Sequence, residues 1–589
     1  MPETRALPTA DTLVLDRVTK RFRSAKRIIC ALDQVSARCR HGIVTGLIGP
    51  DAAGKTTLMR LVAGLLLPDE GSITVLGMDV AKDSLAVQQA LGYMPQRFGL
   101  YGDLTVQENL DLYADLQAVP RIERQQRYEE LMHMTGLAPF TGRLARDLSG
   151  GMKQKLGLAC TLVRAPQFLL LDEATVGVDP VSRRELWGIV YRLVEDEGLT
   201  VLLSTAYLDE AERCQEVILM HEGKILDQGT PASFSHRMAG RTFQVVAPEA
   251  NKRKLQEQLI QSERVMDAII QAEGVRVVIS KGAALEPEQD LPGWPDVTIL
   301  PVEPRFEDSF IVMLKERTAA PPAAGNHAQP QPVSLSDEDV IVVHNVKRRF
   351  GSFYAVKGIS FSVRRGEVFG LLGANGAGKS TTFRMLCGLL PASEGTLRVA
   401  GEDLRRAAAK ARARIGYMAQ HFSLYADLSV SENLTFFSRA YGLRGKEQRE
   451  RTAWALDEFE LRSYADTTSG QMPLGYKQRL ALATALMHSP EILFLDEPTS
   501  GVDPLARREF WHRINRLANQ GVTLLVTTHF MEEAEYCDRL VIMAQGEILA
   551  EGTPEEMKAR FRTPERPKPT MEDAFIGLME TDGQAVTQG

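Results

Sequence analysis

Short and almost wholly apolar runs recur along the chain and predict buried strands. Two of them, Ile43–Ile48 and Val368–Leu372, lead into glycine-rich segments, and two others, Phe168–Leu171 and Ile492–Leu495, end at an acidic pair. A helical pattern follows each glycine-rich segment. No apolar run approaches the ~18 residues that a membrane-spanning helix requires. We therefore expect no direct membrane span.

The pattern occurs twice. GLIGPDAAGKTTLMRLVAGLL at 46–66 returns as GLLGANGAGKSTTFRMLCGLL at 370–390, and FLLLDEATVGVDP returns as LFLDEPTSGVDP. Lys55 and Asp172 are 117 residues apart, as are Lys379 and Asp496, and the offset between the copies is 324. Self-similarity over a constant offset indicates a duplicated domain.

The two copies are separated by a stretch of different character. We place the first copy at 1–239, a small α+β appendix at 240–316, a flexible Pro/Ala-rich linker at 317–337 and the second copy at 338–589. In the appendix, apolar strands are predicted at 242–246, 275–279 and 297–300, with a charged helix near 250–263.

Composition narrows the class of protein. The 589 residues are 44% apolar and 25% charged with a net charge of −7, a balance that disfavours nucleic acid as a partner. A chain of this length suggests roughly four domains. Its six cysteines include no C-x-x-C pair, which argues against a zinc ribbon or a disulfide scaffold. The N-terminal segment lacks the features of a signal peptide.

Each copy carries G-x-x-x-x-G-K-[ST] between a predicted strand and a predicted helix. The glycines let backbone N–H groups converge on phosphate oxygens, the helix N-terminus adds positive charge, and the lysine reaches the outer phosphates. The candidate ATP-binding residues are Gly49, Gly54, Lys55, Thr56 and Thr57 in the first copy, and Gly373, Asn375, Gly376, Gly378, Lys379, Ser380 and Thr381 in the second.

An acidic pair follows the later strand of each copy, Asp172-Glu173 in the first and Asp496-Glu497 in the second. Alone, such a pair is typical of a solvated loop. Beside a phosphate-binding loop, the aspartate suits Mg²⁺ and the glutamate can take a proton from the attacking water.

Further motifs resemble the ATP-binding-cassette family, most closely the fused tandem ATPase subunits of ABC-2-type drug exporters. Leu148-Ser149-Gly150-Gly151-Met152 is similar to the family's signature motif, and Gly177-Val178-Asp179-Pro180 and Gly501-Val502-Asp503-Pro504 are similar to its D-loop. The resemblance implies an α/β fold with two ABC-type P-loop NTPase domains in tandem, each with a helical subdomain. It also implies residue roles: Glu497, His529, Gln420 and Glu173 as catalytic, Thr56, Gln96, Asp172, Ser380, Gln420 and Asp496 around Mg²⁺, Ser149, Gly150 and Gly151 on the partner's ATP, and Phe22 and Phe350 stacked on adenine.

In this family each ATP lies between the phosphate loop of one cassette and the signature motif of the other. The second copy has Met472-Pro473-Leu474-Gly475-Tyr476 in place of the signature, and the first copy has Ala206 where the second has His529. The first copy also has Ala52 at the position of Gly376 in the second. This difference would destabilise the first loop by about 1 kcal/mol if the position needs positive φ. These departures all fall on the ATP held by the first copy's phosphate loop. We therefore expect the second phosphate loop to serve hydrolysis and the first to serve mainly binding, although turnover at both remains an alternative.

The resemblance implies an energy-coupling ATPase of an exporter, using ATP and Mg²⁺ with two separately encoded integral membrane subunits, peripheral on the cytoplasmic face of the inner membrane. The segments 97–104 and 421–428 would face those subunits, with one or two exposed apolar side chains each. The alternatives are a tandem importer ATPase, a soluble cassette protein acting on ribosomes, and a non-catalytic binding module.

Overall fold

The computed structural model describes residues 11–24, 27–96, 99–247, 251–271, 273–294, 296–317, 336–420 and 423–587. The chain divides into two compact units, Met1–Ala239 with Pro304–Leu314, and Gly240–Glu303 with Lys315–Gly589. Most of the predicted linker, residues 318–335, lies outside the described residues. Residues 240–303 of the appendix thus group with the second copy, which the sequence analysis does not anticipate.

The first unit is built on a six-stranded sheet in the order β10-β9-β3-β8-β7-β6, with only the β9–β10 pair antiparallel. All residues of β3, β7 and β8 are buried, as expected of parallel strands covered on both faces. The predicted strands are therefore confirmed. The strands of this sheet are β3 (Val44–Ile48), β6 (Leu91–Met94), β7 (Phe168–Asp172), β8 (Thr200–Thr205), β9 (Glu216–His221) and β10 (Lys224–Gly229).

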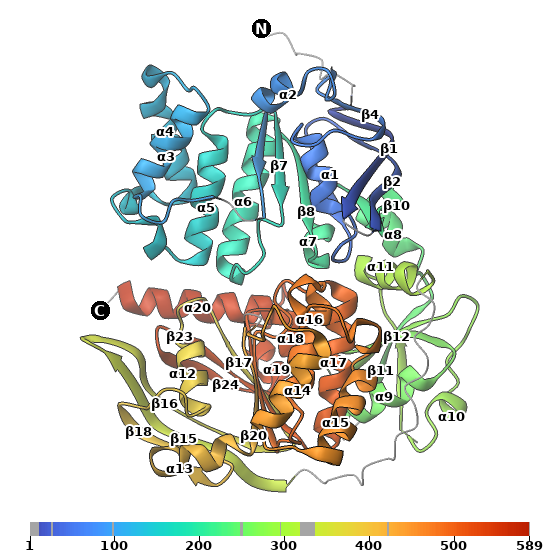
Figure 1. Cartoon of the computed structure of the whole chain (residues 1–589), viewed down its shortest axis with the longest axis vertical. Helices are drawn as coiled ribbons and strands as arrows, with labels where there is room; N and C mark the ends of the chain where they lie inside the picture. The colour runs from blue at the N-terminus through green and yellow to red at the C-terminus, as the bar shows by residue number, and fades with distance from the viewer. Residues whose placement is uncertain are drawn as a thin grey trace. The chain divides into compact units, whose positions relative to one another are not determined.

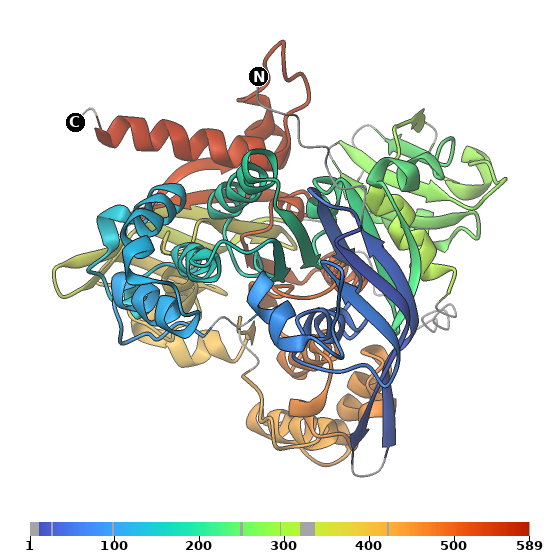
Figure 2. The same ribbon diagram turned by 90° about the horizontal axis from the view of Figure 1, so that it is seen from above.

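A second, antiparallel sheet in the order β2-β1-β4-β5 completes the strands of this unit. Figure 2 shows β1 and β2 running side by side as a long ribbon. Its strands are β1 (Leu13–Ser24), β2 (Arg27–Cys39), β4 (Glu70–Val75) and β5 (Met78–Asp79). The apolar residues of both sheets share one core with helix α1.

Some helices cover the sheets. Helices α3 to α5 form a separate group, which is the predicted helical subdomain (Figure 1). Helix α3 begins at a reciprocal cap in which Thr105 and Glu108 exchange side-chain and backbone hydrogen bonds, which satisfies two N–H groups of its first turn. The helices of the unit are α1 (Lys55–Val62), α2 (Ser84–Ala90), α3 (Val106–Leu116), α4 (Arg121–Thr135), α5 (Gly150–Leu162), α6 (Pro180–Glu197), α7 (Leu208–Glu212), α8 (Pro231–His236) and α11 (Phe306–Lys315), the last residue of which falls in the second unit.

The second copy repeats this architecture. Its sheets have the orders β20-β21-β22-β17-β23-β24 and β16-β15-β18-β19. The strands are β15 (Ser336–Phe350), β16 (Phe353–Arg365), β17 (Val368–Gly373), β18 (Glu394–Val399), β19 (Glu402–Asp403), β20 (Ile415–Met418), β21 (Ile492–Asp496), β22 (Thr523–Thr528), β23 (Arg539–Ala544) and β24 (Glu547–Gly552). The helices are α12 (Lys379–Leu386), α13 (Leu404–Arg412), α14 (Val430–Ala440), α15 (Gly445–Glu458), α16 (Leu474–Ala485), α17 (Pro504–Asn519), α18 (Met531–Ala534), α19 (Pro554–Ala559) and α20 (Met571–Thr587).

The appendix forms a four-stranded antiparallel sheet in the order β12-β13-β11-β14, with its own apolar core. Its elements are β11 (Thr242–Val246), α9 (Lys252–Gln261), β12 (Val265–Gln271), β13 (Gly274–Ile279), α10 (Pro287–Asp290) and β14 (Thr298–Pro301). The three predicted strands and the helix are present, but β12 was missed. Its Asp267 interrupts the apolar run, and that aspartate is buried beside cationic side chains.

Among the described residues, no helix is both long and apolar enough to span a bilayer.

Candidate functional site

In the first copy the phosphate-binding loop joins the buried end of β3 to the start of α1. Gly54 has φ +103°, and a Cβ there would lie 2.6 Å from the carbonyl oxygen of Ala31, so the position requires glycine. The Lys55 ammonium donates to the carbonyls of Gly49 at 2.7 Å and Pro50 at 3.1 Å. Lys55 is thereby held folded across the loop, at the N-terminus of α1.

The second loop has the same geometry. Gly378 has φ +100° and would place a Cβ 2.6 Å from the Ala355 carbonyl oxygen. The Lys379 ammonium donates to the carbonyls of Gly373 at 2.6 Å and Ala374 at 3.0 Å. The hydroxyl residues that open the two helices are half-buried, namely Thr56, Thr57, Ser380 and Thr381, whereas Asn375 is exposed.

One position separates the two loops. Gly376 has φ +85°, and the corresponding Ala52 has φ +62°. The position therefore has the positive φ on which the predicted strain depends. Alanine adopts there a left-handed conformation that glycine reaches freely. A Cβ at Gly376 would meet nothing within 4 Å, so the difference between the loops is conformational rather than steric.

The acidic pair of the first copy lies beside its loop. Asp172 ends β7 and accepts hydrogen bonds from Ser204 at 2.6 Å and Thr56 at 3.3 Å. Glu173 accepts from the Gln96 amide at 2.5 Å, and its carboxylate lies 3.5 Å from the Lys55 ammonium. The residues predicted from the separate motifs therefore meet at one edge of the sheet.

The acidic pair of the second copy has one additional neighbour. The Glu497 carboxylate accepts from the Gln420 amide at 2.7 Å and lies 3.1 Å from Nδ1 of His529. Burial would raise the pKa of Glu497, but His529 and the Lys379 ammonium outweigh it and leave that pKa lowered. Burial raises the pKa of Asp496, against the hydrogen bond that it accepts from Thr527 at 2.6 Å.

Ala206 occupies the position of His529 in the first copy. It follows the buried strand β8 and is itself 3% exposed, so the same backbone path carries a methyl group instead of an imidazole. Glu173 therefore has the Gln96 and Lys55 neighbours but lacks a histidine counterpart.

The signature segments differ at a helix N-terminus. Ser149 caps α5, and its hydroxyl accepts from the N–H of Met152 at 3.3 Å. Gly150 is exposed, and a Cβ on Gly151 would lie 2.2 Å from the Ser182 hydroxyl oxygen. In the second copy Pro473 takes the corresponding N-cap position before α16 and provides no side-chain cap.

The two candidate adenine-stacking aromatics are exposed rather than packed in the core, Phe22 by 38% and Phe350 by 47%. Cations lie over both rings: the Lys20 ammonium is 5.8 Å from the Phe22 centroid and the Arg348 guanidinium 4.6 Å from that of Phe350. Both positions can offer a ring to a ligand.

Two pairs of supporting residues were missed by sequence reasoning. Ser204 and Thr527 hold the aspartates, and the buried carboxylates Glu210 and Glu533 accept from Thr205 and Thr528 at 2.6 Å each. Their recurrence at corresponding positions of both copies is the signal that could have identified them.

The candidate metal-ligating side chains beside each loop fit a magnesium ion. A serine or threonine hydroxyl, an aspartate and a glutamine supply only oxygen ligands, which Mg²⁺ prefers. In the first copy the Thr56 hydroxyl already lies 3.3 Å from Asp172.

The comparisons agree with this geometry. Residues 32–176 and 356–500 each match the family model for the ABC transporter domain. The chain is 51% identical over 574 residues, 96% of its length and 97% of the relative's, to a "probable multidrug ABC transporter ATP-binding protein" of Escherichia coli. It is 46% identical over 211 residues, 36% of its length and 69% of the relative's, to a Nod factor export ATP-binding protein I of Burkholderia orbicola. A linearmycin resistance ATP-binding protein of Bacillus subtilis is 41% identical over 223 residues, 38% of this chain and 72% of the relative.

Two nucleotide-binding loops, each beside an acidic pair and a glutamine, thus coincide with two matches to one family. The chain belongs to the ABC transporter family and is a tandem ATP-binding subunit with ATPase domains.

Proposed function

We propose that this chain energises an ABC exporter of drugs or other hydrophobic compounds by hydrolysing ATP mainly at the phosphate loop of its second copy. The names of the relatives support export, since they refer to multidrug transport, Nod factor export and linearmycin resistance. The unequal surroundings of the two catalytic glutamates support the asymmetry.

The observation that carries the asymmetry is the contact between His529 and Glu497. A general base must be ionised and oriented toward the attacking water. Besides Lys379, Glu497 has both a glutamine and a histidine beside it, whereas the described neighbours of Glu173 are a glutamine and Lys55.

The family's crosswise arrangement extends the argument to the signature segments. If each copy completes the other's ATP site, the second phosphate loop receives Ser149, Gly150 and Gly151, and the first receives the Pro473 segment. Proline has neither a hydroxyl nor a backbone N–H to offer a γ-phosphate. The first phosphate loop would then hold nucleotide and help to keep the copies together.

The proposed chemistry uses groups of the second copy. Lys379 and the N–H groups of residues 373–379 bind the β- and γ-phosphates, Glu497 accepts a proton from the attacking water, and His529 orients that carboxylate. Ser380, Gln420 and Asp496 would hold Mg²⁺, which neutralises phosphate charge when bound.

A matched pair of variants tests the proposal. Glu497→Gln should abolish most of the ATPase activity of the full chain, and Glu173→Gln should leave most of it. Equal losses would contradict the asymmetry. Binding of a fluorescent ATP analogue to both variants checks that each site still holds nucleotide.

We further propose that two separately encoded integral membrane subunits dock on the segments after Gln96 and Gln420, at the cytoplasmic face of the inner membrane. Phe98 and Phe422 lie outside the described residues, but Tyr101 is 56% and Tyr425 50% exposed, as expected. Co-purification from detergent-solubilised membranes tests this proposal. Tyr101→Ala with Tyr425→Ala should release those integral proteins without changing basal ATPase activity.

A further inference from the structure

Residues 240–303 of the appendix pack against one face of helix α17 through polar contacts. Arg508 forms an ion pair with Asp267 of β12. Farther along the helix, the Asn515 amide donates to the Gln256 side chain at 2.9 Å, and Asn519 donates to Glu257 at 3.0 Å. Arg508, Asp267, Asn515 and Gln256 are all at least 95% buried, so these contacts are shielded from water.

The α17 residues in these contacts lie on a single stripe, at positions i, i+7 and i+11 of the helix. The first copy does not have this stripe. Its helix α6 carries Arg184, Tyr191 and Glu195 at the corresponding positions, and Arg184 and Glu195 are exposed. Since both copies share one architecture, the burial of Arg508 is due to the appendix.

A second attachment leads to the phosphate loop. Arg253 of α9 forms an ion pair with Asp538, and the same Asp538 oxygen accepts the N–H of Val368, the first residue of β17. In the first copy the neutral Gln215 accepts the N–H of Val44 at 2.9 Å. The backbone contact is thus common to both copies, but only the second copy presents a charge for an arginine of the appendix.

From α17 a chain of contacts reaches the catalytic glutamate. Arg507, next to Arg508, has its guanidinium 4.6 Å from the ring centroid of Phe530. Phe530 follows His529, whose Nδ1 lies 3.1 Å from Glu497. The Phe530 N–H donates to Thr528 at 2.9 Å, which fixes the backbone on the other side of the histidine.

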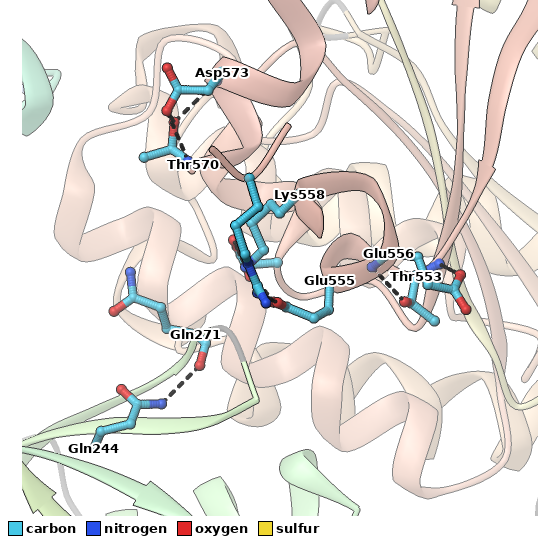
Figure 3. A network of polar contacts seen from close by, with 10 residues as sticks. Gln244, Gln271, Thr553, Glu555, Glu556, Lys558, Thr570 and Asp573 are labelled. Atoms are coloured by element: carbon cyan, nitrogen blue, oxygen red, sulfur yellow. Dashed lines mark hydrogen bonds and ion pairs between the residues drawn. The ribbon is translucent and has the colours of Figure 1, made fainter. Parts of the chain in front are cut away.

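The start of α9 adds a charged contact region. Burial lowers the pKa of Lys252, and Lys558 reinforces this lowering while Glu535 and Glu555 oppose it. Figure 3 shows the Lys558–Glu555 ion pair of α19, with the bond from Gln244 to Gln271 that ties β11 to the end of β12. The contacts named between residues 240–303 and the second copy are polar or charged, as contacts between domains commonly are.

We propose that residues 240–303 are an intramolecular positioning element that holds α17 and β17 of the second copy and thereby sets the geometry of Glu497 and His529. Asp267 and Arg253 are its positioning residues and do not touch nucleotide. The inference rests on the proposed hydrolysis at the second phosphate loop.

The test is a charge exchange at the rim of this contact, where Glu257 is exposed and Asn519 is half-buried. Asn519→Asp places a carboxylate against Glu257 and should lower kcat for ATP roughly two- to fivefold, with KM unchanged. Adding Glu257→Lys to Asn519→Asp restores opposite charges and should restore kcat. An unchanged kcat in Asn519→Asp, or a loss that Glu257→Lys does not reverse, would overturn the inference.

A buried variant gives an independent measurement in the full chain. Asp267→Asn should lower kcat more than Asn519→Asp does, and Arg508→Lys should retain more activity than Arg508→Gln. Arg184→Gln, at the exposed position of the first copy, is the matched control and should have no effect. Calorimetric unfolding of each variant separates a loss of folding from a change in turnover, and Asn519→Asp carries the test if Asp267→Asn does not fold.

Glu497→Gln keeps the two proposals apart. If it retains wild-type turnover, the proposed function fails. If it abolishes turnover and Asn519→Asp leaves kcat unchanged, the inference alone fails.

Discussion

His529 places Nδ1 3.1 Å from an Oε2 oxygen of Glu497, and both side chains are almost wholly buried. A carboxylate in such a setting is expensive to ionise unless cationic or hydrogen-bonding groups face it. Lys379 of the second phosphate loop and Gln420, which follows β20, both act on the Glu497 carboxylate. His529 is the third such group. In the first copy Lys55 and Gln96 take the places of Lys379 and Gln420. Ala206 takes the place of His529.

His529→Ala should therefore lower kcat for ATP about 100-fold, in the range that a positioned proton-transfer group contributes. The KM for ATP should change little, because the histidine acts on the base. Steady-state ATPase assays measure both constants. Ala206→His alone should leave kcat near the wild-type value, since the signature segment proposed to face that ATP remains defective. A His529→Ala enzyme within twofold of wild type would contradict this role.

The left-handed conformation shared by Ala52 and Gly376 gives a prediction about stability. Gly376→Ala should lower the free energy of unfolding of the second copy by about 1 kcal/mol, because alanine is strained at φ +85° while its methyl group has free space. Ala52→Gly should raise the stability of the first copy by less, since φ +62° at Ala52 lies within the allowed left-handed region and leaves less strain to relieve. Calorimetric unfolding of both variants measures the two changes. Equal destabilisation by both substitutions would show that the loop conformation is not the cause.

The sequence alone predicts the parts of the site that depend on short motifs. Lys55 and Glu173 belong to motifs whose spacing recurs in both copies, and the structure brings their side chains within 3.5 Å. This succeeds because a glycine-rich turn between a buried strand and a helix has few alternatives.

Contacts between distant segments were not predictable in this way. The partners Asp267 and Arg508 are 241 residues apart, and neither lies in a motif. Strand β12 was missed for the same reason, because its charged residue reads as exposed until a cation is found to cover it. The strain at Ala52 could be stated only as a condition, since φ is a property of the folded loop.

Repair of the first ATP site should be possible by substitution. In a Glu497→Gln background, Ala206→His with Pro473→Ser and Leu474→Gly should restore measurable ATP hydrolysis through Glu173. The added histidine would orient Glu173, and the serine and glycine would restore the donors expected to face the γ-phosphate. Single-turnover assays with radiolabelled ATP detect the product. Adding Glu173→Gln should remove the restored activity, and if that activity persists, it does not arise at this site.

The exposed ring of Phe350 gives a prediction about affinity. A base stacked on an aromatic side chain contributes about 1–3 kcal/mol, so Phe350→Ala should raise the KM for ATP about tenfold with kcat little changed. Phe350→Tyr keeps a ring and should keep the KM, which separates stacking from a general disturbance of the β15–β16 hairpin. Phe22→Ala should leave the KM for hydrolysis nearly unchanged, because we propose that the first phosphate loop serves mainly binding. It should instead weaken binding of the nucleotide held by that loop. A KM unaffected by Phe350→Ala would mean that adenine is held elsewhere.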